Sequence, residues 1–499
     1  MKKTVRFLSL ILFFIVGSFV LVSCSPYKEL VKASKGLTSY EIKAVLNEEN
    51  MSVDATMVVE VVNKTDVALN SICFNLYGRA FREGALIKPY TSLNQGKCFV
   101  NGLSYGDLVV ENVEVEDKTT SFSIVGEDEN ALEIKLDKDF EPKDKVCVKI
   151  DFSLILAECA HRLGYLNGSI NLGNWFPILA IYEKGEYNIE PYYSTGDPFY
   201  SDIANYSVEF TYPNKYTMSS SGTEKSSCLE GTSKTSCLEA LAVRDFAVFL
   251  TEEANKKSKV VDNITINYVG YDGDNNVDYL LSVAEKTVCY FNKTFGKYPY
   301  KKLDIVKAPF LHGGMEYPSA VIISDSVTQD YDIAKVIVHE IAHQWWYAVV
   351  GNNEIKEAWL DESLAEYSTV LFFAKHKEFD VSYEELISES FANYVLYADI
   401  IKSVNKDINT SMLLKVNEYN SEYEYSYMIY VRGVLMFDSL RDVIGESKLI
   451  KGLKKFYTKY KFSIATTDDF IVSMRKAAGK DIETFMDSWL QGKTVIGTI

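Results

Sequence analysis

Hydrophobic and polar residues alternate with a period of two along much of the chain between about residues 40 and 250. Such alternation, rich in Val and Thr and interrupted by turns, is typical of half-buried β-strands. Long amphipathic helical patterns are few in this region. We therefore predict an all-β, sandwich-like domain over residues 39–252, with strands at 54–62, 71–77, 131–136, 145–156, 206–212 and 240–250.

The pattern changes after a charged, polar run at residues 251–260, which we interpret as a domain junction. Beyond it, strand-like runs at 264–271, 303–308 and 320–324 accompany an amphipathic helical pattern at 277–295. From about residue 330 onward the helical period prevails. We therefore predict an α+β protein whose second domain, residues 253–499, is mostly helical.

The first 23 residues have the pattern of an export signal. Lys2, Lys3 and Arg6 precede an apolar run at 7–22, and Cys24 follows it. This arrangement resembles a bacterial lipoprotein box, in which the Cys becomes the lipidated N-terminus. We predict a lipoprotein signal peptide at 1–23, a polar tether at 24–38, and an extracytoplasmic location on the cell membrane of a bacterium. An uncleaved anchor or a plain secretory signal is the alternative.

The chain is acidic, with 52 Lys and Arg against 69 Asp and Glu and a formal net charge of −17. Removal of the predicted signal peptide leaves 49 basic residues and a charge of −20. So acidic a chain repels nucleic acid and anionic lipid headgroups, and we expect no nucleic-acid partner. The charge mildly favours cationic peptides, although it equally serves solubility.

Eight cysteines occur, and lipidation of Cys24 would leave seven, which cannot all pair within the chain. A near repeat around Cys228 and Cys237 predicts two short strands joined by a turn at Gly231. These two cysteines either form a disulfide or remain free thiols. No cysteine has the spacing of a zinc ligand.

A His-Glu-x-x-His sequence lies in the apolar helical run that follows residue 330. One helical turn separates His339 from His343, so both imidazoles project from one face and can bind one metal ion. Glu340 lies beside them, where its carboxylate can reach a metal-bound water. A histidine on an apolar helix is usually a packed core residue, but only five histidines occur in 499 residues, so a chance match is rare. We predict one Zn²⁺ per chain.

A catalytic zinc ion needs a third protein ligand and leaves one position to water. The helix that carries the histidines is predicted from Asp330, which can cap it, to Gly351. A second helical pattern then starts near residue 361 and places Glu362 in its first turn. We predict Glu362 as the third ligand, and Glu366 as the carboxylate that fixes a ligand histidine's tautomer. Either glutamate could instead lie on a solvated helix face.

These residues resemble the aminopeptidase N family of zinc metallopeptidases, which also contains the leukotriene hydrolase. The family pattern is His-Glu-x-x-His, eighteen residues and a Glu, and residues 339–362 match it at every position. Residues 312–318 are similar to the family's Gly-x-Met-Glu-Asn loop, with Tyr317 in place of Asn. Residues 430–433 resemble its Tyr-x-Lys-Gly, with Arg432 in place of Lys. The resemblance implies a thermolysin-like catalytic domain that follows the β domain.

The resemblance also implies roles for the matched residues. Glu340 would be the general base, Tyr430 would assist catalysis, and Glu316 would pair with the free α-ammonium of a substrate. The substrate would add as a short strand beside the loop residues Gly313, Gly314 and Met315. Residues 171–177 and 196–200 resemble segments of the family's N-terminal domain, and we assign neither a catalytic role.

The resemblance, together with the export signal, implies a membrane-anchored zinc aminopeptidase that acts on peptides with a free N-terminus. Longer members of the family add a helical domain that caps the site. Two domains of about 250 residues each leave no room for it here, so we expect an open cleft. A zinc endopeptidase or another amide hydrolase is the alternative. A third interpretation is a peptide-binding lipoprotein with a vestigial zinc site.

Overall fold

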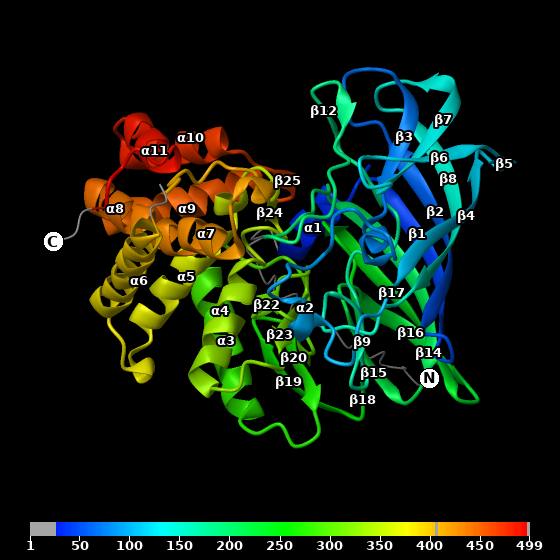
Figure 1. The fold of residues 1–499 in the computed structure, drawn as a ribbon, viewed down its shortest axis with the longest axis horizontal. Coiled ribbons are helices and arrows are strands. Elements are labelled where there is room, and N and C mark those ends of the chain that lie inside the picture. Colours follow the sequence, from blue (N-terminus) through cyan, green and yellow to red (C-terminus); the bar gives the residue numbers. More distant parts are fainter. Residues whose placement is uncertain (1–25, 405–407, 497–499) are drawn as a thin grey trace, which may run out of the picture.

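The structure, a computed structural model, describes residues 26–404 and 408–496. Figure 1 shows a strand-rich half built from the first part of the chain and a helical half built from the last part. The predicted α+β class, a β domain followed by a mostly helical domain, is confirmed. The predicted signal peptide and Cys24 lie outside the described residues.

The largest sheet of the first domain has eight strands. Neighbouring strands are antiparallel except for one parallel pair, in which Ile42 lies opposite Val208. Alternate residues of the central strands are buried, so one face packs on the core and the other faces solvent. In order across the sheet, the strands are β16 (Thr223–Glu230), β17 (Ser233–Val243), β14 (Ala204–Pro213), β1 (Ser39–Asn47), β2 (Ser52–Val62), β8 (Lys145–Ile155), β4 (Asp107–Val115) and β5 (Lys118–Thr119).

Two four-stranded sheets share a core with the large sheet, which gives the domain its layered, sandwich-like architecture. Phe249 from one and Phe74 from the other are buried in that core. The first sheet consists of β15 (Tyr216–Ser220), β18 (Val248–Glu252), β10 (Ser169–Leu172) and β9 (Leu163–Leu166). The second consists of β11 (Ile178–Leu179), β3 (Leu69–Asn75), β7 (Ala131–Phe140) and β6 (Phe122–Val125). A hairpin of β12 (Tyr182–Glu183) and β13 (Glu186–Tyr187) and the short helix α2 (Gln95–Cys98) complete the domain.

The second domain starts with a five-stranded sheet whose three central strands are parallel. Its order is β19 (Ala254–Val261), β20 (Ile264–Tyr271), β21 (Lys302–Ala308), β23 (Ala320–Ser324) and β22 (Gly314–Met315). The short edge strand β22 lies against the helix α4, which carries the His-Glu-x-x-His sequence. The helices are α3 (Val277–Thr294), α4 (Asp330–Ala342), α5 (Glu362–Lys375), α6 (Tyr383–Ser403), α7 (Glu422–Ser426), α8 (Arg432–Ile444), α9 (Glu446–Tyr460), α10 (Thr467–Ala478) and α11 (Glu483–Leu490).

Strand β20 has the predicted bounds, but the strand predicted at 240–250 is wrong. The chain leaves the large sheet after β17 and enters a different sheet at β18. Between them Arg244 is buried and donates to the backbone oxygens of Tyr347 and Ser201, which holds the chain in a turn. The charged run at 251–260 contains the end of β18 and most of β19, an edge strand whose lysines face solvent.

The segment predicted as a tether with little packing is wrong for residues 26–38. Residues Pro26–Ala33 form helix α1, which lies against β17 and buries Leu30. Glu29 forms an ion pair with Lys461, more than 400 residues away in the chain. A helix of two turns with one buried side is too short to give a clear periodic signal. None of the described helices combines the length and apolarity needed to cross a bilayer.

The seven described cysteines are all free. In the β16–β17 pair, Cys228 lies opposite Thr235, whereas Cys237 lies opposite Ser226. The register therefore offsets the two cysteines by two positions, which favours the free-thiol alternative.

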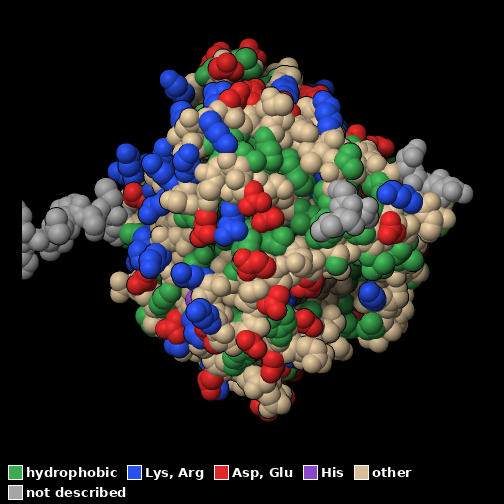
Figure 2. Space-filling view, turned by 90° about the vertical axis from the view of Figure 1, so that its left-hand side faces the viewer, with side chains coloured by type: hydrophobic (Ala, Val, Ile, Leu, Met, Phe, Trp, Pro, Cys, Tyr) green, Lys and Arg blue, Asp and Glu red, His purple; other side chains and the backbone are tan. Residues whose placement is uncertain are grey.

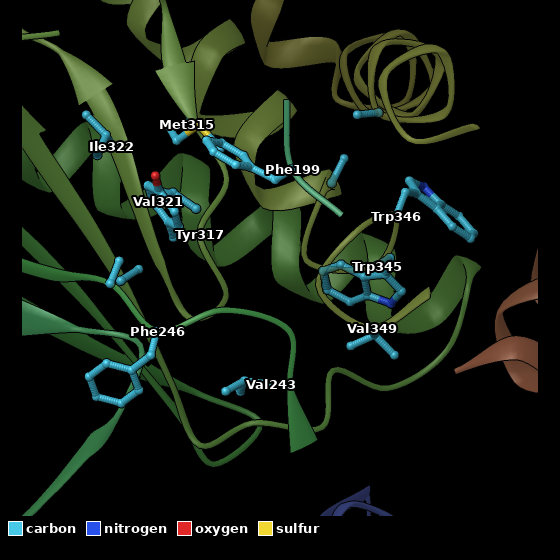
Figure 3. Packing of buried hydrophobic residues seen from close by; sticks show 14 of the residues in the cluster. Phe199, Val243, Phe246, Met315, Tyr317, Val321, Ile322, Trp345, Trp346 and Val349 are labelled. Carbon is cyan, nitrogen blue, oxygen red and sulfur yellow. The ribbon is translucent and has the colours of Figure 1, made fainter. Parts of the chain in front are cut away.

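One continuous hydrophobic core extends through both domains. Figure 3 shows part of it, where residues of both domains are seen together, among them Val243, Phe246, Met315, Tyr317 and Trp345. Figure 2 shows the outer face of the helical half, where acidic and basic side chains are interspersed. The shared core fixes how the domains meet, so side chains from both can contribute to one site.

Candidate active site

Three side chains of α4 and α5 converge at one point. The Nε2 atoms of His339 and His343 lie 3.1 Å apart, and Glu362 Oε2 lies 3.2 Å from the first and 3.1 Å from the second. A tetrahedral zinc ion with ligand distances of about 2.0–2.1 Å holds its ligand atoms roughly 3.3 Å apart. The triangle of predicted ligands therefore has the dimensions of a zinc site.

The second ring nitrogen of each histidine has its own acceptor. His339 Nδ1 lies 2.9 Å from Glu366 Oε2, and His343 Nδ1 lies 3.0 Å from the Trp346 backbone oxygen. With the hydrogen on Nδ1, each Nε2 carries a lone pair. Two lone pairs at 3.1 Å repel unless a cation lies between them, so the donor set fits a metal ion. Glu366 occupies the outer position that the sequence predicts for it.

Helix α4 ends at Ala342, nine residues before the predicted end at Gly351. The apolar run in the sequence continues past the end of the helix because Trp345 and Trp346, which follow it, are also buried in the core. Gly351 instead lies in β24 (Val350–Gly351), where a Cβ would overlap the guanidinium of Arg244. That glycine therefore permits close contact between the two domains.

The Glu340 carboxylate lies in the cleft beside the predicted ligands. The residue is 4% exposed, and its Oε2 has no hydrogen-bond partner in the part of the chain that the structure describes. Burial raises the pKa of Glu340 to about 7, although His339 and His343 act to lower it. A carboxylate with an unused acceptor and this pKa is suited to taking up and returning a proton.

Tyr430 lies in a turn of π-helix (Tyr427–Val431) that leads into α8. Its hydroxyl donates a hydrogen bond to Glu362 Oε1, and its ring stacks on His339 with the centroids 5.8 Å apart. The close approach of α8 to α5 depends on Gly433, where a Cβ would overlap the Ser363 hydroxyl. The glycine of the 430–433 motif thus brings the Tyr430 hydroxyl to the predicted metal site.

Arg432, where the similar family has Lys, lies outside the cleft and is fully buried. Its guanidinium lies 4.8 Å from the Trp489 ring centroid and donates to the Thr494 backbone oxygen at 2.9 Å. The side chain therefore ties the helix that follows Tyr430 to the C-terminal segment. The departure from the family pattern does not alter the cleft.

Glu316 is 4% exposed, and its Oε1 has no hydrogen-bond partner among residues 26–404 and 408–496. One of its carboxylate oxygens lies within 4.8 Å of a ring nitrogen of His343. Burial raises the pKa of Glu316 well above the ordinary value for a glutamate, and the nearby Asp197 raises it further. A sheltered acid with an unused oxygen can accept a charge-assisted hydrogen bond from a cationic group.

Tyr317, where the similar family has Asn, lies in the core and not in the cleft. Its hydroxyl donates to Asn174 Oδ1 at 2.7 Å, and the Asn174 amide donates to Asp245. Gly173 leaves the space that Tyr317 occupies, because a Cβ there would overlap the phenol. The segment 171–177 therefore fixes the loop that carries Glu316.

The cleft around these residues has a volume of about 510 Å³, and its lining includes charged side chains that no sequence motif indicates. Arg162 and Asp197, both from the first domain, form an ion pair with 2.8 Å between Nη1 and Oδ1. Asp197 also places an oxygen within 4.8 Å of oxygens of Glu316 and Glu362. The segment 196–200 resembles part of the family's N-terminal domain, but its sequence does not indicate a functional role for Asp197. A single acidic residue in a loop gives no local sequence signal.

Residues 279–489, which include the predicted metal ligands, Glu316, Glu340 and Tyr430, match the family model described as the peptidase family M1 domain. The chain contains a peptidase family M1 domain. Aminopeptidase N of Lactococcus lactis subsp. lactis is 26% identical over 232 residues, which are 44% of this chain and 27% of that protein. Aminopeptidase N of Lactobacillus helveticus is 29% identical over 233 residues, 43% of this chain and 26% of that protein. The matches span about a quarter of the length of these curated relatives.

The likeness in structure extends beyond the M1 domain. The M1 zinc metallopeptidase from Deinococcus radiodurans aligns over 92% of this chain and 95% of its own, with a TM-score of 0.65 and 14% identity. A point mutant of that protein, bound to a Tyr-Ser-Ala substrate, has the same TM-score at 13% identity. The two domains of this chain therefore share the fold of an M1 zinc metallopeptidase.

Proposed function

We propose that this chain is a zinc-dependent aminopeptidase that removes N-terminal residues from peptides. The position of Glu316 carries the proposal. Its buried carboxylate, whose Oε1 has no hydrogen-bond partner among the described residues, lies on the His343 side of the predicted metal site. There it can bind the α-ammonium of a substrate whose first peptide bond reaches the metal. The tripeptide bound to the Deinococcus protein supports a short peptide as the substrate class.

Zinc held by His339, His343 and Glu362 would supply a Lewis acid and a bound water whose pKa is lowered to about 7. Glu340 takes a proton from the attacking water and delivers it to the leaving amine. With substrate bound, the Tyr430 hydroxyl turns its single hydrogen from Glu362 Oε1 to the scissile carbonyl oxygen as negative charge develops there. Gly313 and Gly314 leave the backbone beside the metal site open to a substrate strand.

Release of the N-terminal residue from a panel of tripeptides, with and without a chelator, tests the proposal. We expect release that stops when the metal is removed and returns with added Zn²⁺. Acetylation of the substrate's N-terminus should abolish cleavage, whereas a zinc endopeptidase would still cut the blocked peptide. Glu340→Gln should bind zinc but not turn over; turnover by this variant would contradict the mechanism.

We further propose that Cys24 carries a lipid that holds the enzyme at an extracytoplasmic membrane surface. The sequence of residues 1–24 supports this, and α1 begins at Pro26 and is packed on the β domain. Expression in a bacterial host, followed by detergent phase partitioning, tests the proposal. The wild-type protein should enter the detergent phase and Cys24→Ala the aqueous phase; wild-type protein in the aqueous phase would contradict the anchor.

A further inference from the structure

Three residues of the loop before β23 lie in register beside α4. A Cβ on Gly313 would lie 3.5 Å from Val336 Cγ2, and a Cβ on Gly314 would overlap the Glu340 carboxylate. A carboxylate oxygen of Glu316 lies near a ring nitrogen of His343. Going from Glu316 back to Gly313, the loop thus runs along α4 toward its N-terminal end. A substrate peptide that pairs with this loop as a strand would therefore run parallel to the axis of α4.

Lys335 lies at the far end of that axis from Glu316. It precedes His339 by one helical turn, so its side chain projects from the same face of α4 and lines the cleft. The side chain is half-buried, and its Nζ lies 6.0 Å from the Tyr331 ring centroid. It forms no ion pair with any described residue. The nearby Glu366 carboxylate is already bonded to His339 Nδ1 at 2.9 Å. The cleft therefore has a cation that forms no ion pair with a described carboxylate, on the side of the metal site opposite the amine-binding carboxylate.

The other two cations that line the cleft are placed differently. Arg162 is buried and committed to Asp197 at 2.8 Å. Lys97 lies on α2 in the first domain, exposed on the other wall of the cleft. Only Lys335 of the three lies on the helix that carries the metal-binding histidines.

The distance along α4 sets the length of peptide that reaches Lys335. His343 follows Lys335 by eight positions, which is about 12 Å along the helix axis. An extended peptide spans at most roughly 3.3–3.6 Å per residue, so about three residues cover this distance. A tripeptide with its α-ammonium at Glu316 would place its C-terminal carboxylate at Lys335.

We propose that Lys335 binds the C-terminal carboxylate of short peptides and makes the enzyme selective for free tripeptides. This inference rests on the proposed aminopeptidase function and adds the substrate class to it. The bond between an ammonium and a carboxylate in a partly sheltered cleft is strong enough to distinguish an acid from an amide. Longer peptides would carry their carboxylate past Lys335 and lose this contact.

The test compares Ala-Ala-Ala with its C-terminal amide, and the pentapeptide acid with its amide. In the wild-type enzyme, kcat/KM should be about tenfold higher for the tripeptide acid than for its amide, a difference of about 1.4 kcal/mol. The pentapeptide pair should show a ratio near one. Lys335→Met should bring the tripeptide ratio close to one, and Lys335→Arg should retain most of it. Lys97→Met, which removes a cation from the other wall, should leave the ratio unchanged.

The ratio is measured within one preparation, so it does not depend on how much of a variant is folded. A merely structural role for Lys335 would lower both rates together and keep the ratio. A wild-type ratio of one, or a ratio that survives Lys335→Met, would overturn the proposal. Calorimetry can measure the binding of the tripeptide acid and of its amide to the zinc-loaded Glu340→Gln variant. The ratio of the two affinities tests the same preference for the acid without turnover. Absence of any N-terminal release would contradict the proposed function, while the calorimetric ratio would still decide the role of Lys335.

Discussion

Gly314 lies against the Glu340 carboxylate so closely that a Cβ on the glycine would overlap it. Gly313, its neighbour, has ordinary space, because a Cβ there would lie 3.5 Å from Val336 Cγ2. The edge strand β22 thus forms one wall of the space in which the proposed general base sits. The requirement for glycine at position 314 comes from the position of Glu340 and not from the backbone conformation of the loop.

Gly314→Ala should therefore displace the Glu340 carboxylate while the fold is retained. We expect kcat to fall by about 100-fold, the effect of misplacing a catalytic group by roughly 1 Å, with little change in zinc content. Steady-state kinetics and metal analysis measure both. Gly313→Ala is the matched control and should keep most of the activity. Equal losses in the two variants would mean that the loop needs both glycines for the substrate, not for Glu340.

Tyr430→Phe should separate catalysis from metal binding. The ring keeps its stacking on His339, but the hydroxyl that reaches Glu362 Oε1 is lost. Removal of one hydrogen bond to a developing oxyanion costs about 10²–10³ in kcat. We expect a loss of this size in kcat with zinc affinity within a fewfold of the wild type. Tyr425→Phe, whose hydroxyl lines the cleft without a partner among the described residues, is the control. A large loss of zinc from Tyr430→Phe would instead assign the hydroxyl to holding Glu362.

The sequence predicts the groups that lie close together in the chain or in a fixed spacing. His339 and His343 are one helical turn apart, and Glu362 follows at the family's spacing, so one helix pair positions all three. Asp197 and Arg162 reach the same cleft from the β domain, more than 140 residues away from His339, and no local pattern indicates them. Their contribution depends on how the two domains pack.

Two departures from the family pattern also depend on residues that are distant in the sequence. Tyr317 replaces an Asn, and its partners are Gly173 and Asn174 of the other domain. Arg432 replaces a Lys, and its partners are Trp489 and the Thr494 backbone near the C-terminus. In both cases the substituted side chain is buried against residues distant in sequence. The motif alone therefore shows that a position differs, whereas the structure shows what compensates for it.

Glu366→Ala should weaken zinc binding more than it affects the fold. The variant loses the acceptor that lies 2.9 Å from His339 Nδ1, so the tautomer that frees Nε2 for the metal is less favoured. Loss of such an outer partner typically lowers metal affinity by about 10–100-fold. Competition with a chelator measures the affinity. Glu389→Ala, an exposed glutamate of α6 close to Glu366, should not change it. Equal affinities for wild type and Glu366→Ala would show that Glu366 does not orient the ligand.

Asp245 should make the stability of the protein depend on pH. Burial raises the pKa of Asp245 from 3.8 to about 7, although the Phe246 backbone amide and the Asn174 side chain act to lower it. The folded protein therefore holds an extra proton between about pH 4 and 7, and the free energy of unfolding falls as the pH rises through this window. Below this pH window Asp245 is protonated in both the folded and the unfolded protein. Above it, the full free-energy cost of burying the ionised carboxylate remains. A shift of this size corresponds to a cost on the order of 4 kcal/mol.

Asp245→Asn should remove the contribution of Asp245 to this slope. The amide cannot accept from both Phe246 and Asn174, so the variant is less stable by an offset that does not vary with pH. The readout is therefore the change in the free energy of unfolding between pH 4 and 7, from denaturant titrations at several pH values. The wild type should lose more stability across this range than Asp245→Asn does. Asp139→Asn, an exposed residue of β7, should follow the wild type. Parallel curves for wild type and Asp245→Asn would show that Asp245 is ionised in the folded protein throughout the range.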